Sequence, residues 1–285
     1  MKNCIITGGN SGIGYAAAMQ IAAKGYGVTL ICRNEASAQN ACAEIISHSG
    51  DENVDYLIAD LSEMKEVRRA AAEYLDARAS LDVLINNAAD FDLSVKSPIM
   101  TSDGMEKQFA TNVAAPFLLS KLLFPALKKS GDGRIVNISS QGLCVYPFIR
   151  PDFDNLNGGR SYSPSKTYYQ NKLALLMWSL YMADSQKDVK IQAVRVTNVK
   201  IDMSRYDHIH PILKRMYRIK SKFAISPEEM SKVYTALAAA DGYSGFLYDE
   251  KMREVRANRS AYDKYAQKRL YELLCQKTAM DQFSD

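Results

Sequence analysis

A tyrosine and a lysine one helical turn apart could carry out proton transfer together. Tyr168 and Lys172 are four residues apart, and this spacing places two side chains on the same face of a helix. A free tyrosine has a pKa of about 10, so its phenol is a weak acid at neutral pH. A neighbouring ammonium stabilises the phenolate and lowers this pKa. The pair therefore predicts a general acid for the reduction of a carbonyl group.

A second pair, Tyr162 and Lys166, has the same spacing and competes for this role. Pro164 stands between its two members. The residue before a proline is displaced from helical geometry, and proline itself fits in the first turn of a helix. We therefore expect Tyr162 to precede the helix and Tyr168 to be the acid. The alternative is that both tyrosines serve only in packing.

A serine is the third residue with a predicted part in this chemistry. Ser140 comes just after the β-rich run 134–138, which predicts a strand. Ligands of open α/β sheets bind outside the carboxyl ends of the strands. We expect the hydroxyl of Ser140 to form a hydrogen bond with the substrate oxygen.

A glycine-rich turn, TGGNSGIG at residues 7–14, predicts a phosphate-binding site between a strand and a helix. Glycine permits a tight turn and a close approach of the backbone to a pyrophosphate. The helix that follows offers free N–H groups and the positive end of its dipole. The spacing is GxxxGxG rather than GxGxxG, and the alternative is a purely structural turn. The expected cofactor contacts in the turn are Gly8, Asn10, Ser11, Gly12, Ile13 and Gly14.

The end of the second predicted strand indicates which dinucleotide is preferred. A carboxylate there would bind the ribose 2′-hydroxyl of NAD, but the sequence reads Arg33-Asn34. A guanidinium suits the geometry of a phosphate, so Arg33 and Asn34 are expected to contact NADP(H). NAD(H) remains the alternative because Glu35 is near. Arg33 could also be an ordinary solvated side chain.

The elements that must position these residues alternate along the chain. β-rich runs are followed by stretches of helical period, which predicts a parallel sheet covered by helices on both faces. The expected strands are 3–7, 28–32, 54–59, 83–86, 134–138 and 190–196, with 244–248 as one more candidate. The expected helices are 13–24, 35–47, 63–78, 105–128 and 167–183. We expect one doubly wound α/β domain over residues 1–285, with an excursion near 202–225.

Composition excludes several other classes of protein. Of 285 residues, 47% are apolar and 24% charged, and the net charge is only +4. These values exclude a disordered chain and give no support for a nucleic-acid partner. Five cysteines form no CxxC, and Cys4 and Cys32 are expected to be buried. His208 and His210 have no third ligand nearby, so no metal site is expected. We expect a cytoplasmic protein without a targeting segment or membrane span.

Several motifs occur along the first 200 residues in the order of one known family. They are TGGNSGIG, Asp60 after the third predicted strand, NNAA from Asn86, TNV at 111–113, RIVNISS ending at Ser140, and YYQNKLA from Tyr168. Together they resemble the short-chain dehydrogenase/reductase family, and in spacing its retinol dehydrogenase and protochlorophyllide reductase branch. The family usually has NNAG, so Ala89 is a mild departure.

The resemblance implies a Rossmann-type fold and an NADP(H)-dependent oxidoreductase. The expected reaction interconverts a carbonyl and an alcohol on an apolar substrate of lipid, steroid or polyketide type. By the same resemblance, Lys172 also grips the nicotinamide ribose beside Tyr168, and Asn112 holds a water that links Lys172 to solvent. Further implied cofactor contacts are Asp60, Leu61, Asn87, Ala88, Ala89 and Val199. The family often dimerises through helices equivalent to 105–128 and 167–183, so a homodimer is expected.

Two departures from the family leave a second function open. Asn171 stands where a serine often precedes the lysine, and the stretch 196–199 reads VTNV where the family has a Pro-Gly turn near the nicotinamide. This change favours the alternative of a non-catalytic NADP(H)-binding sensor or regulatory protein. The intact set of Ser140, Tyr168, Lys172 and Asn112 favours the enzyme.

Residues 200–222 indicate how the substrate is covered. Seven lysines and arginines stand there against two aspartates, and apolar residues recur at helical spacing. The resemblance implies a lid over the substrate, and its basic face would suit a substrate with an acidic group. The alternatives are contact with an anionic membrane and ordinary packing. Tyr146, Phe148 and Phe153 are expected either to line the substrate pocket or to pack their loop.

Overall fold

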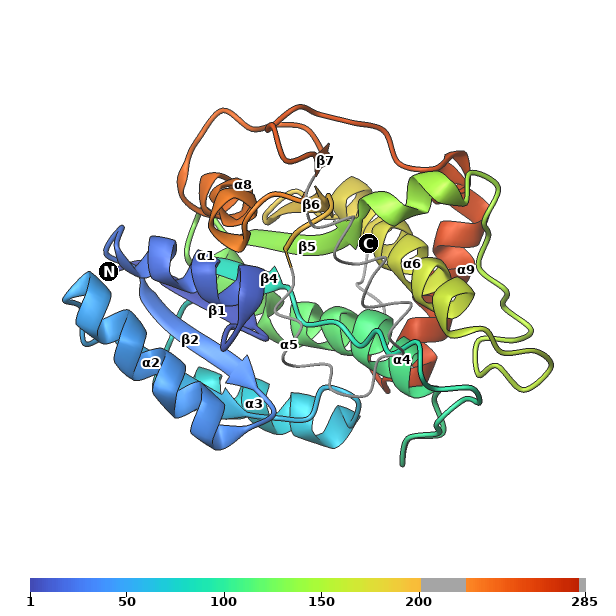
Figure 1. The fold of residues 1–285 in the computed structure, drawn as a ribbon, viewed down its shortest axis with the longest axis horizontal. Coiled ribbons are helices and arrows are strands. Elements are labelled where there is room, and N and C mark those ends of the chain that lie inside the picture. The colour runs from blue at the N-terminus through green and yellow to red at the C-terminus, as the bar shows by residue number, and fades with distance from the viewer. Residues whose placement is uncertain (201–223, 282–285) are drawn as a thin grey trace.

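A parallel sheet of seven strands runs through the centre of the structure, a computed structural model that describes residues 1–200 and 224–281 (Figure 1). The strands are β1 (Asn3–Thr7), β2 (Gly27–Cys32), β3 (Val54–Ile58), β4 (Val83–Asn86), β5 (Arg134–Ser140), β6 (Lys190–Val196) and β7 (Leu247–Tyr248). Their order is β3-β2-β1-β4-β5-β6-β7, and every neighbouring pair is parallel. The predicted doubly wound α/β fold is confirmed. The order changes direction between β1 and β4, where such folds form a ligand crevice.

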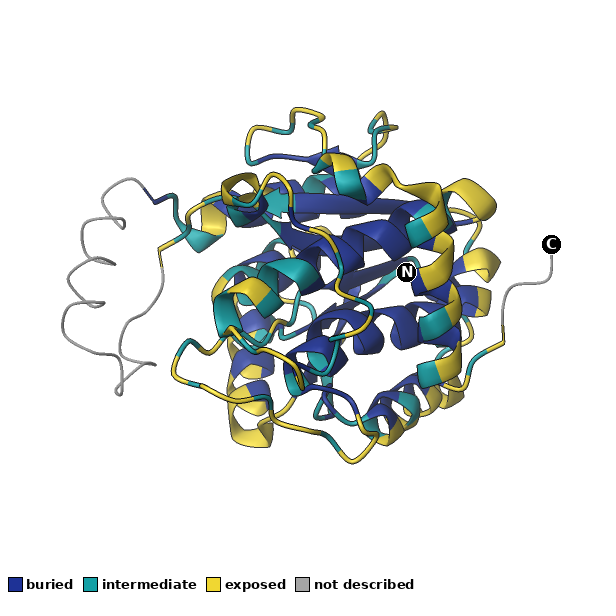
Figure 2. Ribbon diagram, turned by 90° about the vertical axis from the view of Figure 1, so that its right-hand side faces the viewer, coloured by how far each residue is buried: buried dark blue, intermediate teal, exposed yellow. Residues whose placement is uncertain are grey.

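Helices cover both faces of this sheet (Figure 1). One face packs against α1 (Gly12–Ala22), α2 (Glu35–Ser49) and α8 (Pro227–Ala239). The other packs against α3 (Met64–Ala77), α5 (Ala115–Lys129) and α6 (Pro164–Ser185), with α9 (Lys264–Lys277) against α6. Side chains alternate along each strand, so Ile5 joins one core and Cys4 and Ile6 the other. Buried residues, dark blue in Figure 2, therefore fill the sheet and the inward sides of the helices.

The predicted helix 105–128 is divided into three pieces. A short α4 (Lys107–Phe109) leads into a π-helical turn, η1 (Ala110–Ala114), and then into α5. The N–H of Ala115 donates to the carbonyl of Ala110, five residues back. Pro116 has no N–H to give to Asn112, so the regular bond at that place cannot form. The turn therefore follows from the proline and sets the position of Asn112.

Other differences from the sequence predictions concern the bounds of two elements and several elements that were not expected. α6 begins at Pro164, three residues earlier than expected, and the candidate strand 244–248 is reduced to the two residues of β7. α8, α9 and the 3₁₀ turns η2 (Gln141–Val145) and η5 (Arg259–Tyr262) were not predicted. The excursion near 202–225, with His208, His210 and its basic helix, lies outside the described residues except for its last two positions.

The run Lys107–Lys129 is long and apolar enough to cross a membrane by length and composition alone. In this fold 83% of its most apolar window is buried inside the protein. A central helix of a layered α/β fold has the same composition, because it is covered by the sheet and by other helices.

Candidate active site

The glycine turn after β1 is held against the end of β4. The side-chain amide of Asn87 donates from Nδ2 to the carbonyl oxygens of Thr7, at 2.9 Å, and of Gly8, at 3.3 Å. Gly8 has a φ of +64°, which a side chain would strain. A Cβ at Gly14 would lie 2.4 Å from Nδ2 of Asn87 and 2.6 Å from the oxygen of Gly8. Glycine is therefore required at both positions for α1 to begin this close to β4.

Replacing Gly14 by Ala is expected to weaken NADPH binding about tenfold or more, because the new methyl group displaces Asn87 and opens the turn. Gly25→Ala is the matched control. Gly25 has a positive φ of +79°, unlike Gly14, and a Cβ there would meet nothing within 4 Å. The control should lower thermal stability and leave the dissociation constant unchanged. Equal affinity of the Gly14 variant and the wild type in a fluorescence titration would contradict the assignment of the turn.

A cavity of about 480 Å³ opens at the carboxyl ends of β1, β2 and β4. Its size lies within the usual range for small-molecule sites. Predicted residues that line it are Gly8, Asn10, Ser11, Ile13, Gly14, Arg33, Asn34, Asp60, Leu61, Asn87, Ala88 and Ala89. Four predicted cofactor contacts, Gly12, Val199, Tyr168 and Lys172, do not line it. Sequence reasoning missed Ile31, Cys32, Ala59, Asp90, Lys107 and Thr111, which also line it.

Two cations border the far end of this cavity. Exposed Arg33 and half-buried Lys107 both act on the carboxylate of Asp60. Burial alone would raise the pKa of Asp60, but two hydrogen bonds from Ser62 and these two cations hold it below its ordinary value. Asn34 caps α2 by accepting the N–H of Ser37 at 2.9 Å. The start of α2 therefore also faces the cavity, and its dipole adds to the positive field of the cations.

Three features of the cavity suit the phosphates of a dinucleotide. They are the glycine turn of residues 7–14, the N-termini of α1 and α2, and the basic side chains Arg33 and Lys107. The glycine turn would bind the pyrophosphate, since the N-terminus of the helix that follows offers free backbone N–H groups. Arg33 and the start of α2 would take a phosphate on the adenosine ribose. The fit rests on the lining of the cavity, which includes Gly8, Ser11 and Gly14 of the turn together with Arg33 and Lys107.

Tyr168 and Lys172 lie together on α6, one turn apart. The Nζ of Lys172 is 5.6 Å from the centre of the Tyr168 ring. Nζ also donates to the carbonyl oxygen of Ile138 on β5 at 2.7 Å, which ties α6 to the strand that ends at Ser140. Lys172 is only 2% exposed, and this burial lowers its pKa to about 8. The hydrogen bond to Ile138 thus holds Nζ near the Tyr168 ring.

Tyr162 lies outside this helix, as the position of Pro164 predicted. Ser163 caps α6, so Tyr162 precedes the first turn. Its hydroxyl accepts a bond from Gln108 at 3.2 Å and donates to Glu106 at 3.4 Å. Burial first and the Glu106 carboxylate second raise the pKa of Tyr162 to about 12. The phenol of Tyr162 is therefore a weaker acid than that of a free tyrosine.

Ser140 ends β5 and caps the η2 turn. Its Oγ accepts the N–H of Gly142 at 3.1 Å, and accepting this bond does not use the hydroxyl's own proton. A Cβ at Gly142 would lie 2.3 Å from the ring of Tyr169, so the ring rests directly on the backbone of η2. This contact brings the turn after Ser140 against the helix segment that carries Tyr168.

Asn112 lies in the π-helical turn η1 and holds the loop after β4. Its Nδ2 donates to the carbonyl of Asp90, and its Oδ1 accepts the N–H of Asp90, both at 2.8 Å. Lys107 pairs with the carboxylate of Asp90 at 3.7 Å. The same loop carries Ala88 and Ala89 to the cavity. The water-holding role of Asn112 stays a prediction.

Aromatic rings surround Tyr168. Phe91 lies 4.2 Å from it between ring centres, and Tyr169 lies 5.3 Å away. Tyr146 stacks on Tyr169 at 5.0 Å. Phe91 was missed because nothing in the irregular stretch after β4 marks it, apart from being aromatic among polar residues. The ring of Tyr168 is therefore in contact with two other aromatic rings.

The other two loop aromatics have different positions. Phe153 lies under the guanidinium of Arg269, 4.4 Å from it, and so packs its loop against α9. Phe148 is 91% exposed. Neither contacts Tyr168 in the described structure.

The turn after β6, where the family has Pro-Gly, is tied down differently. The hydroxyl of Thr197 donates to Oε1 of Gln141 at 2.6 Å. Val199 pairs with Ile225 in an isolated parallel bridge. The turn is thus joined both to η2, next to Ser140, and to the chain before α8.

A buried chain of polar side chains links the layers behind the site, and sequence reasoning missed it. Asn86 on β4 donates to Ser120 of α5 at 3.1 Å and to Asn137 of β5 at 2.8 Å. Asn137 donates to Ser179 of α6 at 2.7 Å. Its signal in the sequence was an asparagine next to an apolar run in each of the two strands.

Known proteins with similar sequences belong to one family of enzymes. The profile of the family described as short chain dehydrogenase matches residues 2–209. Human retinol dehydrogenase 14 is 32% identical over 95% of this chain and 84% of its own length. Human polyprenol dehydrogenase is 28% identical over 97% of this chain and 84% of its own. Mouse retinol dehydrogenase 11 is 31% identical over 85% of this chain and 74% of its own.

Solved structures show the same fold. The L-sorbose reductase of Gluconobacter frateurii, complexed with NADPH and L-sorbose, has a TM-score of 0.67 at 20% identity, over 90% of this chain and 97% of that one. An alcohol dehydrogenase of Thermococcus sibiricus, complexed with 5-hydroxy-NADP, has a TM-score of 0.65 at 18% identity, over 91% and 97%. The predicted resemblance is confirmed: the chain belongs to the short-chain dehydrogenase family of oxidoreductases and resembles its retinol dehydrogenases.

Proposed function

We propose that the protein interconverts a carbonyl and an alcohol on an apolar substrate, with NADP(H) as cofactor and Tyr168 as general acid and base. The observation that carries this proposal is the placement of the Lys172 ammonium, buried and 5.6 Å from the Tyr168 ring. The aromatic surrounding of Tyr168 supports an apolar substrate. So do the names of two relatives, since retinol and polyprenol are apolar alcohols.

The cavity residues would hold the cofactor, which when bound supplies or accepts the hydride. Tyr168 then gives its proton to the substrate oxygen, and the ammonium of Lys172 stabilises the phenolate that forms. The bond from Nζ to Ile138 keeps the ammonium in place during this step. Ser140 donates a hydrogen bond to the same substrate oxygen and so orients the carbonyl. In alcohol oxidation the same groups act in reverse.

Replacing Arg33 by Ala is expected to weaken NADPH binding about 10- to 100-fold and to leave NADH binding unchanged. A charge-assisted hydrogen bond to phosphate contributes about 1.5–3 kcal/mol, and only NADPH carries the 2′-phosphate. Arg256→Ala, also at an exposed arginine but away from the cavity, is the control. Equal losses of affinity for NADPH and NADH would show that Arg33 does not distinguish the two cofactors.

Consumption of NADPH across a panel of carbonyl compounds tests the whole proposal. The panel spans small aldehydes, steroid ketones, apolar long-chain aldehydes and acidic ketones, with NADH in parallel. Turnover of an apolar class with NADPH, lost in Tyr168→Phe, is the expected result. Tight NADPH binding without turnover on any compound would favour the non-catalytic alternative, for which the altered turn at Thr197 is the supporting observation.

A further inference from the structure

The middle of the helix that carries Tyr168 and Lys172 is covered on every side. Ten consecutive residues, Asn171–Leu180, are buried, which is almost three full turns. A helix that lies on a sheet with its outer side in water would bury only one face. Strands β5 and β6 cover the inner side of α6. The cover on the outer side comes from α9 (Figure 1).

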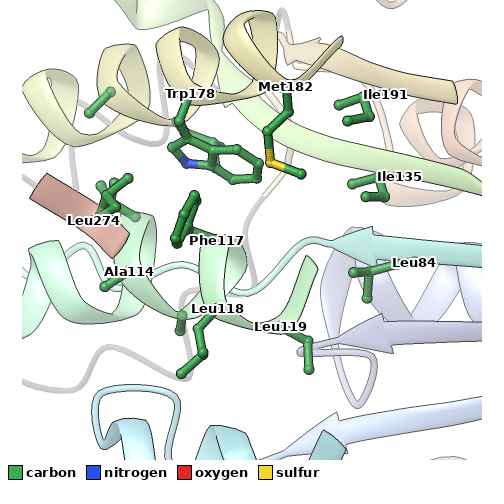
Figure 3. Close-up of a cluster of buried hydrophobic side chains, with 14 of the residues drawn as sticks. Leu84, Ala114, Phe117, Leu118, Leu119, Ile135, Trp178, Met182, Ile191 and Leu274 are labelled. Carbon is green, nitrogen blue, oxygen red and sulfur yellow. The ribbon is translucent and has the colours of Figure 1, made fainter. Parts of the chain in front are cut away.

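α9 fills the groove between α5 and α6 with apolar side chains. Tyr271 packs edge-on against Phe117 of α5, at 5.4 Å between ring centres, and lies 4.7 Å from Tyr181 of α6. Leu270 and Leu274 have no exposed surface. Figure 3 shows Leu274 beside Phe117 and Trp178, which meet edge-on at 5.7 Å.

Polar contacts fix the position of α9 along the groove. Lys121 of α5, itself 6% exposed, donates from Nζ to the hydroxyl of Tyr271 at 3.1 Å. Lys264 at the start of α9 forms an ion pair with Asp184 at the end of α6. Beyond the end of α9, Arg68 of α3 donates to the carbonyl of Ala279 at 3.1 Å. These contacts reach three helices, so α9 has one defined register on them.

The outer side of α9 is polar. Its exposed residues are Lys264, Tyr265, Lys268, Arg269, Glu272 and Gln276. Lys268 and Glu272 form an ion pair at 3.9 Å, one turn apart on this side. Stable interfaces between subunits are depleted of lysine and glutamate at their centre. The outer side of α9 is therefore a solvated surface.

We propose that α9 occupies, within the same chain, the surface of α5 and α6 that a second copy would need, and that the protein is a monomer in solution. The resemblance to the family implied pairing through these two helices, but the described structure leaves no apolar face on them to pair. A second copy would first have to displace Leu270, Tyr271 and Leu274 from the groove. α9 is tethered to the chain, so its effective concentration at the groove exceeds that of a separate molecule.

The mass of the full chain in solution tests this proposal directly. Sedimentation equilibrium from low to high micromolar concentration is expected to give 31.8 kDa throughout. Twice this mass at any of these concentrations would overturn the proposal. The measurement needs no variant and no cofactor, so its outcome is independent of the proposed enzymatic activity.

A variant that removes α9 from the groove gives the second test. Leu274→Asp places a charge against Phe117 and Trp178 and should release the helix. Trp178 is the chain's one tryptophan and is fully buried, so its emission should shift to the red. The uncovered groove should also raise the mass above that of a monomer. Gln276→Asp, on the exposed side of α9, should change neither.

Far-ultraviolet circular dichroism shows whether the sheet and the other helices survive in the variant. If Leu274→Asp does not fold, Tyr271→Ala is the milder substitution to use in its place. A folded variant with unshifted emission and the mass of a monomer would show that α9 is not the cover, and would overturn the proposal.

Discussion

Replacing Tyr168 by Phe is expected to abolish turnover while NADPH still binds. The substitution removes only the hydroxyl, so the ring keeps its packing against Phe91 and Tyr169. General acid catalysis contributes about 10²- to 10⁴-fold to a rate, and we expect a loss in kcat of that size. Initial rates with saturating NADPH measure this loss. A fluorescence titration of NADPH binding measures the affinity.

The same substitution at Tyr162 is the matched control, because this tyrosine belongs to the competing pair. Its hydroxyl bonds to Gln108 and Glu106, so Tyr162→Phe should lower stability by about 1 kcal/mol and change kcat by less than about twofold. Full turnover in Tyr168→Phe would remove Tyr168 from the mechanism. Loss of turnover in Tyr162→Phe instead would assign the catalytic role to Tyr162.

Replacing Lys172 by Met is expected to act in opposite directions on rate and stability. Turnover should fall about 10²-fold or more, since the phenolate of Tyr168 loses its stabilising charge. Stability at pH 7 should rise. Burial lowers the pKa of Lys172 from 10.5 to about 8, and this difference means that the folded state holds the ammonium at a penalty of about 3 kcal/mol. The lost bond to Ile138 offsets about 1 kcal/mol of the gain.

The pH dependence separates this effect from simple repacking. The penalty is fully present below about pH 8, where Lys172 is protonated in both the folded and the unfolded protein. Between about pH 8 and 10.5 only the unfolded chain keeps the proton, so the stability contributed by this group rises with pH. The advantage of Lys172→Met should therefore shrink across this range. Chemical denaturation at pH 7 and pH 10 measures it.

The wild-type rate provides a second check on Lys172. Loss of the ammonium above about pH 8 should lower kcat/KM for carbonyl reduction in the free enzyme. Lys166→Met, at an exposed lysine of the same helix, should alter neither rate nor stability. A stability gain that is the same at pH 7 and pH 10 would contradict the buried-charge explanation.

The sheet and the glycine turn could be predicted because their sequence signals are local. Strands buried on both faces are continuous apolar runs, and the glycine spacing of residues 7–14 stands directly between a strand and a helix. Pro164 similarly determined where α6 begins, and so which tyrosine shares a face with its lysine. Each of these features depends on residues that are close together in the sequence.

The features that the sequence did not predict depend on distant contacts. The π-helical turn at Asn112 follows locally from Pro116. The contact that Asn112 makes from this turn depends on Asp90, which lies in another loop. Phe91 reaches Tyr168 only because the loop after β4 folds over α6. α9 has the spacing of an amphipathic helix at Leu270 and Leu274. Nothing in that spacing shows that it packs on α5 and α6 rather than on the sheet.

The buried chain from Ser120 through Asn86 and Asn137 to Ser179 has a consequence for fold specificity. Apolar contacts tolerate a strand that slips or a helix that rotates, because one methyl group replaces another. A hydrogen-bonded amide does not, since any slip leaves buried polar atoms without partners. These buried hydrogen bonds therefore favour one register for β4 and β5 and one rotation for α5 and α6. Apolar residues at both asparagines could preserve stability while the relative placement of Asn112 and Lys172 becomes less well defined.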